Sequence, residues 1–243
     1  MSVKTARKRK EFKVEMSVED IFSPNWLLNF KIKKPFYFNP VHKEFYNCIK
    51  HPNTKITFVD GPAGSMKTYI AVYAGLELIK QESFNKLVYI RSIAESAERS
   101  LGSLPGEIDD KFSPYAIPLE EKVIEITDHS TCAMLKQKGV IEALPVNFVR
   151  GLTFNKSLVV VDEAQNLSRK ELTTILTRFG RDSIYIVCGD SNQADVSRSG
   201  YREIFNKFNN KKCKDNGIHA FEFGLSEISR SKILRFICAV LGT

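Results

Sequence analysis

The sequence predicts an α/β fold with a mostly parallel β-sheet and helices on both of its faces. Apolar, β-branched runs of strand length recur along the 243 residues, and stretches of helix-forming residues separate them. A glycine-containing turn joins the first of these strands to a helix. Strands that alternate with helices favour a parallel sheet, and a chain of this length can bury one large core.

The expected elements follow from these runs in chain order. Strands are expected at residues 55–60, 86–90, 146–149, 157–162, 184–188 and 219–223, and helices at 45–49, 68–80, from 119 onward, 168–178 and 232–241. Residues 101–118 contain three prolines and two glycines, so this stretch is expected to be mostly loop. We expect a basic N-terminal extension over residues 1–35 and one domain over residues 36–243.

The chain carries an excess of positive charge. It has 36 Lys and Arg against 28 Asp and Glu, a formal net charge of +8. Basic residues gather in residues 1–10 and again in residues 207–214. These clusters are either solvated surface charge or contacts to the phosphate backbone of a nucleic acid, where basic groups gain affinity by releasing counterions. Charge alone leaves both interpretations open.

Composition also indicates where the protein works. No apolar run approaches the roughly 20 residues of a membrane span, and the polar N-terminus does not resemble a signal peptide, so we expect a cytoplasmic protein with no membrane partner. Five cysteines lie far apart and only four histidines are present, so neither a zinc site nor a disulfide framework is indicated.

A phosphate-binding loop is predicted where the first strand meets the first long helix. The residues there are Gly61, Pro62, Ala63, Gly64, Ser65, Met66, Lys67 and Thr68. In a Walker A motif of this kind, backbone N–H groups cradle the phosphates of ATP, the lysine contacts the β and γ oxygens, and the hydroxyl binds Mg²⁺. An ordinary strand-to-helix turn, or a degenerate loop that no longer binds nucleotide, remains the alternative.

Met66 departs from the motif because it stands in the place of the last glycine. A side chain is tolerated there if the backbone φ angle is negative. We expect it to crowd the phosphates and to slow turnover.

An acidic pair follows the most apolar strand. Asp162 ends this strand and Glu163 comes directly after it, at the sheet edge where open α/β sheets bind ligands. Asp162 is therefore predicted to hold Mg²⁺ through water and Glu163 to polarise the attacking water as general base. The alternative is a helix N-cap with acids in its first turn.

A third motif, Gly189-Asp190-Ser191-Asn192-Gln193, ends the next strand. Alone it indicates only a turn with an Asx cap. In series with the two motifs above, it predicts a polar side chain, Gln193, that senses the γ-phosphate.

These motifs together resemble the PhoH-like family, phosphate-starvation-inducible ATPases whose core is similar to superfamily-one helicases. The matching stretches, between Gly61 and Asp195, are GPAGSMKT, LGSLPGEIDDKFSPYAIPL, VRGLTF, VVVDEAQN, LTRFG and CGDSNQAD. The proline-rich stretch from Leu101 to Leu119 is the most diagnostic of this family, because general P-loop proteins lack it. A weaker likeness covers roughly residues 40–240. The resemblance implies a RecA-like P-loop NTPase domain with an extra strand between the two Walker strands.

The resemblance also assigns roles to further residues. Gln165 falls with Gln193 on polar positions that report the γ-phosphate. Arg230 resembles the late arginine of the helicase motifs, and Arg178 ends a helix where ring ATPases often present an arginine to a neighbour's site. His42 stands where related proteins often carry a glutamine that reads adenine, so selectivity for ATP is an open question.

We therefore expect an ATPase that requires Mg²⁺, acts on RNA or another single-stranded nucleic acid, and assembles as a homo-oligomer, with a hexameric ring as the candidate arrangement. One alternative is a nucleotide sensor or scaffold with little hydrolysis, which Met66 keeps open. Another is a small-molecule kinase, which would not need the second and third motifs.

Overall fold

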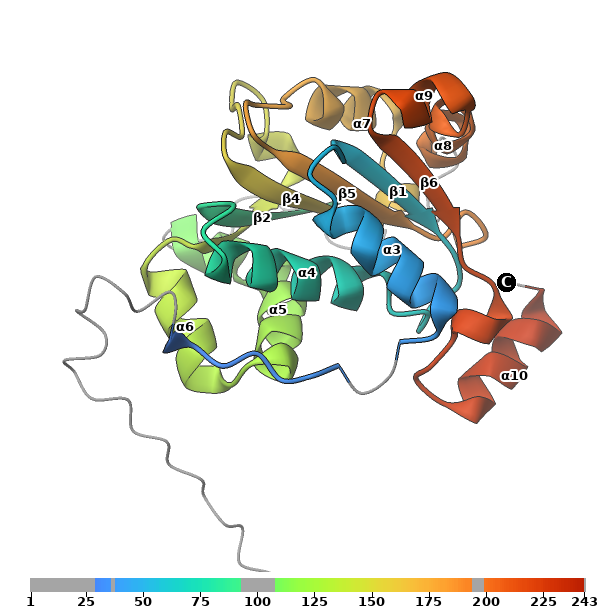
Figure 1. Ribbon diagram of the computed structural model, residues 1–243, viewed down its shortest axis with the longest axis horizontal. Helices are drawn as coiled ribbons and strands as arrows, with labels where there is room; N and C mark the ends of the chain where they lie inside the picture. Colours follow the sequence, from blue (N-terminus) through green and yellow to red (C-terminus); the bar gives the residue numbers. More distant parts are fainter. Residues whose placement is uncertain (1–28, 36–37, 93–107, 194–198, 243) are drawn as a thin grey trace, which may run out of the picture.

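The computed structural model describes residues 29–35, 38–92, 108–193 and 199–242, and side chains from residue 115 onward in the third range. Its centre is one six-stranded sheet in the order β3-β2-β4-β5-β1-β6 (Figure 1). All five pairings between neighbouring strands are parallel. The α/β class predicted from the sequence is confirmed.

The strand order fixes which motifs lie side by side. The strands are β1 (Ile56–Asp60), β2 (Lys86–Arg91), β3 (Ile141–Pro145), β4 (Ser157–Asp162), β5 (Ile184–Gly189) and β6 (Ile218–Glu222). Because β5 lies between β1 and β4, the strand expected between the two Walker strands is present. Every residue of β1, β4 and β5 is buried, as expected for central strands covered on both faces.

Helices cover both faces of the sheet (Figure 1). One face carries α3 (Pro40–Lys50), α4 (Lys67–Lys80), α5 (Ile108–Ile126) and α6 (His129–Gln137), and the other carries α7 (Arg169–Leu176) and α8 (Tyr201–Phe208), followed by the short α9 (Lys211–Asp215). Two apolar clusters fill the two layers, one against α4 and one against α7 and α8. The last helix, α10 (Lys232–Leu241), extends from one end of the sheet.

The prediction of a loop over residues 101–118 is wrong where it can be compared. Residues 108–118 form the first half of α5, although this helix contains Pro114 and Pro118. A proline loses one backbone hydrogen bond but does not end a helix whose packing compensates. Here Leu119, Val123 and Ile126 are buried in the core. Residues 101–107 lie outside the described residues.

The prediction of a strand at 146–149 is also wrong. Residues Val146–Phe148 form a short 3₁₀ turn, and the strand is β3, immediately before it. β3 contains Glu142, Ala143 and a terminal proline, so it lacks the β-branched run that reveals the other strands. Pairing with β2 at the edge of the sheet stabilises it instead.

The described part of the predicted extension packs on the domain. Phe30 is buried in the core, and its carbonyl accepts a hydrogen bond from Lys80 Nζ at 2.7 Å. Residues 1–28 lie outside the described residues. None of the helices in the described ranges is long and apolar enough to cross a membrane.

Candidate functional site

The turn between β1 and α4 has the backbone of a phosphate loop. Gly64 has a φ of 77°, and Met66 has a φ of 65° just before α4 begins at Lys67. The positive φ favours glycine at position 64, and a Cβ there would also lie 2.5 Å from a methyl carbon of Leu234 in α10, which would have to move. The α4 N-terminus thus faces the loop, where backbone N–H groups favour an anion.

Met66 adopts the left-handed conformation that a glycine would adopt, contrary to the condition of a negative φ. Its side chain packs against the core cluster on the α3 and α4 face. The cost of Met66 is therefore backbone strain of about 1–2 kcal/mol. Crowding of the phosphates, which we expected from the sequence, is not what this geometry favours.

This strain can be measured with Met66→Gly and Met66→Ala. Both variants lose the packing of the methionine, but only glycine relieves the left-handed backbone. We expect the free energy of unfolding of Met66→Gly to be about 1 kcal/mol higher than that of Met66→Ala. The rate of ATP turnover should differ less than about threefold between the two variants. Denaturant unfolding and steady-state kinetics measure the two quantities. Equal stabilities, or a large gain in turnover with glycine, would contradict the strain account.

Lys67 and Thr68, the last residues of the motif, turn back toward the loop and the sheet. Lys67 Nζ donates to the carbonyl oxygens of Gly61 and Pro62 at 2.6 and 2.9 Å, so its charge lies within the turn. Thr68 Oγ1 donates to Asp162 Oδ1 at 2.6 Å. The two Walker motifs therefore meet directly, as the strand order requires.

Thr68 and Asp162 form a fitting pair of ligands for Mg²⁺. The cation prefers oxygen ligands and commonly takes only one or two protein groups besides water and phosphate oxygens. Tyr89 OH donates to Asp162 Oδ2, so the side chain is held from both sides. Burial of the Tyr89 hydroxyl, together with the neighbouring Asp162 carboxylate, raises the pKa of Tyr89 far above its ordinary value.

Glu163 stands beside this pair, and its side chain is 41% exposed. Its backbone φ of 51° lies in the left-handed region, a strained conformation for a glutamate. Glu163 Oε2 accepts a hydrogen bond from Gln165 Nε2 at 2.6 Å, and Oε1 lies 3.7 Å from a guanidinium nitrogen of Arg91. The carboxylate is thus oriented from two sides while it remains open to water.

Gln165 links the acidic pair to the turn after β5. Its Oε1 accepts the backbone N–H of Asp190 at 3.0 Å. Burial raises the pKa of the Asp190 carboxyl. Gln193 lies at the end of the same turn with an exposed side chain, and its N–H donates to the Asp190 carbonyl. All three motifs therefore meet at one edge of the sheet, where β1, β4 and β5 end.

Comparison with known proteins agrees with this arrangement. A family model described as PhoH-like protein matches residues 38–241. The chain belongs to the PhoH-like family. Membership places it among nucleotide-binding P-loop proteins with a RecA-like α/β fold.

Curated members of the PhoH-like family are similar over the part of the chain that holds the site. A PhoH-like protein of Mycobacterium tuberculosis is 37% identical over 150 residues, 60% of this chain and 42% of that protein. A PhoH-like protein of Bacillus subtilis is 35% identical over 143 residues, 59% and 44%. Protein PhoH of Escherichia coli is 29% identical over 184 residues, 74% and 51%. The chain thus spans about half the length of these relatives or less.

His42 of this PhoH-like chain lies beneath the phosphate loop, only 1% exposed. Its Nε2 is 3.2 Å from the Ser65 carbonyl oxygen, and its Nδ1 is 3.4 Å from the backbone nitrogen of Asn39. A neutral imidazole protonated on Nε2 satisfies both contacts, and burial lowers the pKa of His42, which favours this neutral form. The geometry therefore favours support of the loop over the reading of adenine.

The two arginines predicted for catalysis lie at opposite ends of the strands: Arg230 near the carboxyl ends and Arg178 near the amino ends. Ser229 N–H donates to the Gly64 carbonyl at 3.2 Å, so the exposed Arg230 lies beside its own phosphate loop. Arg178 follows α7 at the other end, where its carbonyl accepts the N–H of Phe154, a residue that precedes β4. Its buried Nε has no hydrogen-bond partner in the structure. Arg178 is far from its own loop, as expected, and Arg230 is not.

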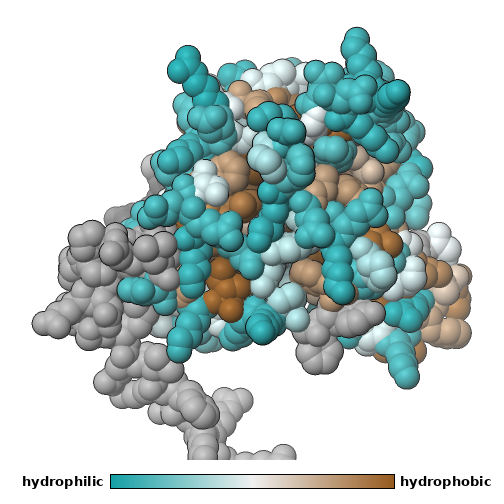
Figure 2. Space-filling view, in the orientation of Figure 1, coloured by the Kyte–Doolittle hydropathy of each residue, from teal (hydrophilic) through white to brown (hydrophobic). Residues whose placement is uncertain are grey.

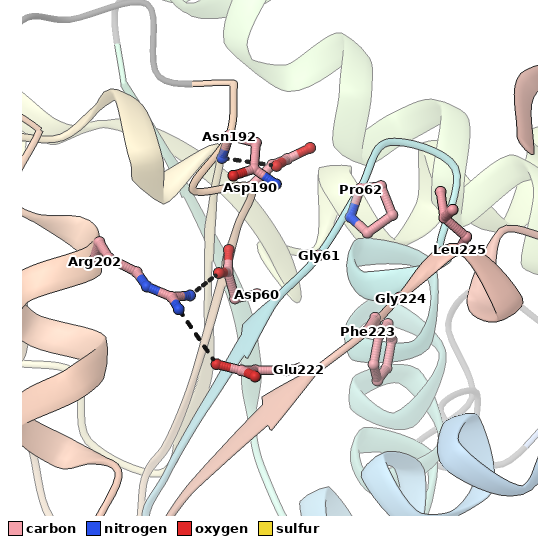
Figure 3. A pocket seen from close by; sticks show the side chains of 10 residues that line it. All are labelled: Asp60, Gly61, Pro62, Asp190, Asn192, Arg202, Glu222, Phe223, Gly224 and Leu225. Atoms are coloured by element: carbon pink, nitrogen blue, oxygen red, sulfur yellow. Dashed lines mark hydrogen bonds and ion pairs between the residues drawn. The ribbon is translucent and has the colours of Figure 1, made fainter. Parts of the chain in front are cut away.

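Sequence reasoning missed a charged group beside the loop. Asp60, the last residue of β1, contacts Arg202 of α8, which also lies 3.6 Å from Glu222. These residues line a pocket of about 220 Å³ next to Gly61 and Pro62 (Figure 3). A carboxylate at the end of a mostly apolar strand, directly before a glycine, was the available signal.

Proposed function

We propose that this PhoH-like protein binds ATP with Mg²⁺ and hydrolyses it. The observation that supports this most is the contact between Thr68 and Asp162, with Glu163 oriented beside them by Gln165. Bound Mg²⁺ would neutralise charge on the phosphates. Lys67 would bind the β and γ oxygens, and Glu163 would take a proton from the attacking water. Met66 has the backbone conformation that the glycine of the motif would have, which supports a loop that still binds nucleotide.

Lys67→Ala tests the binding half of this proposal. The variant loses a charge-assisted contact to the phosphates, a contact typically worth about 1.5–3 kcal/mol, so we expect ATP to bind about 10- to 100-fold more weakly. Titration of a fluorescent ATP analogue measures the dissociation constant. Lys80→Ala is the matched control, because Lys80 ends the same helix at the far side from the loop and its ammonium group donates to the Phe30 carbonyl. Equal affinity in the wild type and Lys67→Ala would contradict the proposal.

We propose single-stranded nucleic acid, and RNA first, as the partner. The support is the net charge of +8 and the basic cluster Lys207, Lys211, Lys212 and Lys214, which lies on α8 and α9. The side chains of all four lysines are exposed, and Lys207 pairs with Glu203 of the same helix. Each phosphate contact would add about −0.7 to the slope of log affinity against log salt.

We also propose that the chain assembles with copies of itself. An exposed apolar stripe on α10 supports this: Ile233, Phe236, Ile237, Val240 and Leu241 are 44–69% exposed. Figure 2 shows apolar residues at the surface on the right-hand side, where α10 lies in Figure 1. Contiguous apolar surface of this kind typically marks an interface. Leu234 of the same helix lies against Gly64 of the phosphate loop, so a neighbouring copy on α10 would lie close to the nucleotide.

The two alternatives differ from this proposal in what they predict for turnover. A nucleotide sensor would bind ATP without hydrolysing it, and a small-molecule kinase would stay slow until its acceptor was added. The oriented Glu163 beside the Mg²⁺ ligands favours the ATPase over both, because neither alternative needs a general base for water.

A further inference from the structure

The carboxylate of Asp60 ties the start of the phosphate loop to the turn after β5. Its Oδ1 accepts the backbone N–H of Ser191 at 2.8 Å, and its Oδ2 accepts the Ser191 hydroxyl at 2.6 Å. The two residues are 131 positions apart in the chain. Ser191 is therefore held by both of its donors.

Arg202 of α8 also contacts the Asp60 carboxylate. Its Nη1 donates to Asp60 Oδ2 at 2.7 Å, and its Nη2 lies 3.6 Å from Glu222 Oε1 (Figure 3). The Asp60 side chain is only 9% exposed, whereas that of Arg202 is 52% exposed. A carboxylate this buried needs charged or hydrogen-bonding partners, and these three donors supply them.

The same turn continues toward the acidic pair. Asp190, the neighbour of Ser191, donates its backbone N–H to Gln165 Oε1, and Gln165 Nε2 donates to Glu163 Oε2. An unbroken series of short contacts thus runs from the residue before the phosphate loop to the predicted general base. Within the described residues, Asp60, Ser191 and Arg202 make no hydrogen bond or ion pair with Glu163 itself.

We propose that Asp60, Ser191 and Arg202 are positioning residues that set the place of the Glu163 carboxylate through the turn after β5. This inference rests on the proposed ATP hydrolysis. A general base acts in the chemical step, where it activates the water, and not in nucleotide binding. A misplaced Glu163 therefore lowers kcat and leaves ATP binding largely intact. A displacement of about 1 Å can cost up to about 100-fold in rate.

The test measures kcat and KM for ATP in Ser191→Ala and Arg202→Met. We expect kcat to fall about tenfold or more in each variant, while KM changes less than about threefold. Ser191→Thr keeps the hydroxyl and should restore most of the rate. Arg169→Met is the matched control, because Arg169 also pairs with an acid of α8, Glu203, but away from the loop. Its kcat should equal that of the wild type.

A second measurement separates positioning of Glu163 from a general effect on the fold. In a Glu163→Gln background, Ser191→Ala should lower the residual rate no further, because the group that it positions is already lost. A further tenfold fall there, or unchanged kcat in both single variants, overturns the inference. If the wild-type protein does not hydrolyse ATP, the proposed function fails instead, so the two failures are distinguishable.

Discussion

Glu163→Gln is expected to lower kcat by about two to four orders of magnitude while ATP binding is retained, because general-base catalysis contributes an effect of this size. The amide cannot accept the proton of the attacking water, yet it has nearly the same shape. Its oxygen can still accept the bond from Gln165. The loop residues Lys67 and Thr68, which we propose as the residues that hold the nucleotide, are untouched.

The measurement is a single-turnover rate beside a dissociation constant for ATP. Glu171→Gln is a suitable control, since Glu171 belongs to the capping box of α7 and lies outside the site. It should alter stability and leave turnover unchanged. A Glu163→Gln variant that turns over ATP at the wild-type rate means that another group activates the water.

If the proposed homo-oligomer forms a shared site, Arg178→Ala is expected to lower kcat by about 10³-fold or more, the size of effect that an arginine finger typically has. The charge that builds on the transferred phosphoryl group needs more than Lys67. Arg178 lies near the amino ends of the strands, opposite its own loop, so in a head-to-tail ring it would face the loop of the next copy. Arg230, beside its own loop, would act within one chain.

Mixing experiments distinguish these two positions. Glu163→Gln mixed with Arg178→Ala should regain activity, because some interfaces then pair an intact acid with an intact arginine. Glu163→Gln mixed with Arg230→Ala should regain none, because every site lacks one of its own groups. If neither mixture recovers turnover and the protein sediments as a monomer with ATP, the shared-site proposal fails.

The chemistry-bearing residues could be predicted because each motif is short and follows a buried strand. Gly61 to Thr68 are contiguous, and Asp162 and Glu163 follow the most apolar run of the chain. Parallel strands end at one edge of the sheet, so these motifs were bound to meet once β1, β4 and β5 were placed together. The structure adds the contact between Thr68 and Asp162.

The residues that support the site could not be predicted in this way. Asp60 and Ser191 are 131 positions apart, and His42 contacts Ser65 across 23. Such pairs leave no local pattern in one sequence. The helix through Pro114 and the edge strand β3 were missed for a related reason, because packing against distant segments stabilises them against their own propensities.

The most direct test of the account is ATP hydrolysis by the purified chain with Mg²⁺, measured alone, with single-stranded RNA and with single-stranded DNA, beside Glu163→Gln. The account predicts turnover that requires Mg²⁺, rises with single-stranded RNA and falls by about two to four orders of magnitude in the variant. Turnover no higher in the wild type than in Glu163→Gln, under all three conditions, would contradict it.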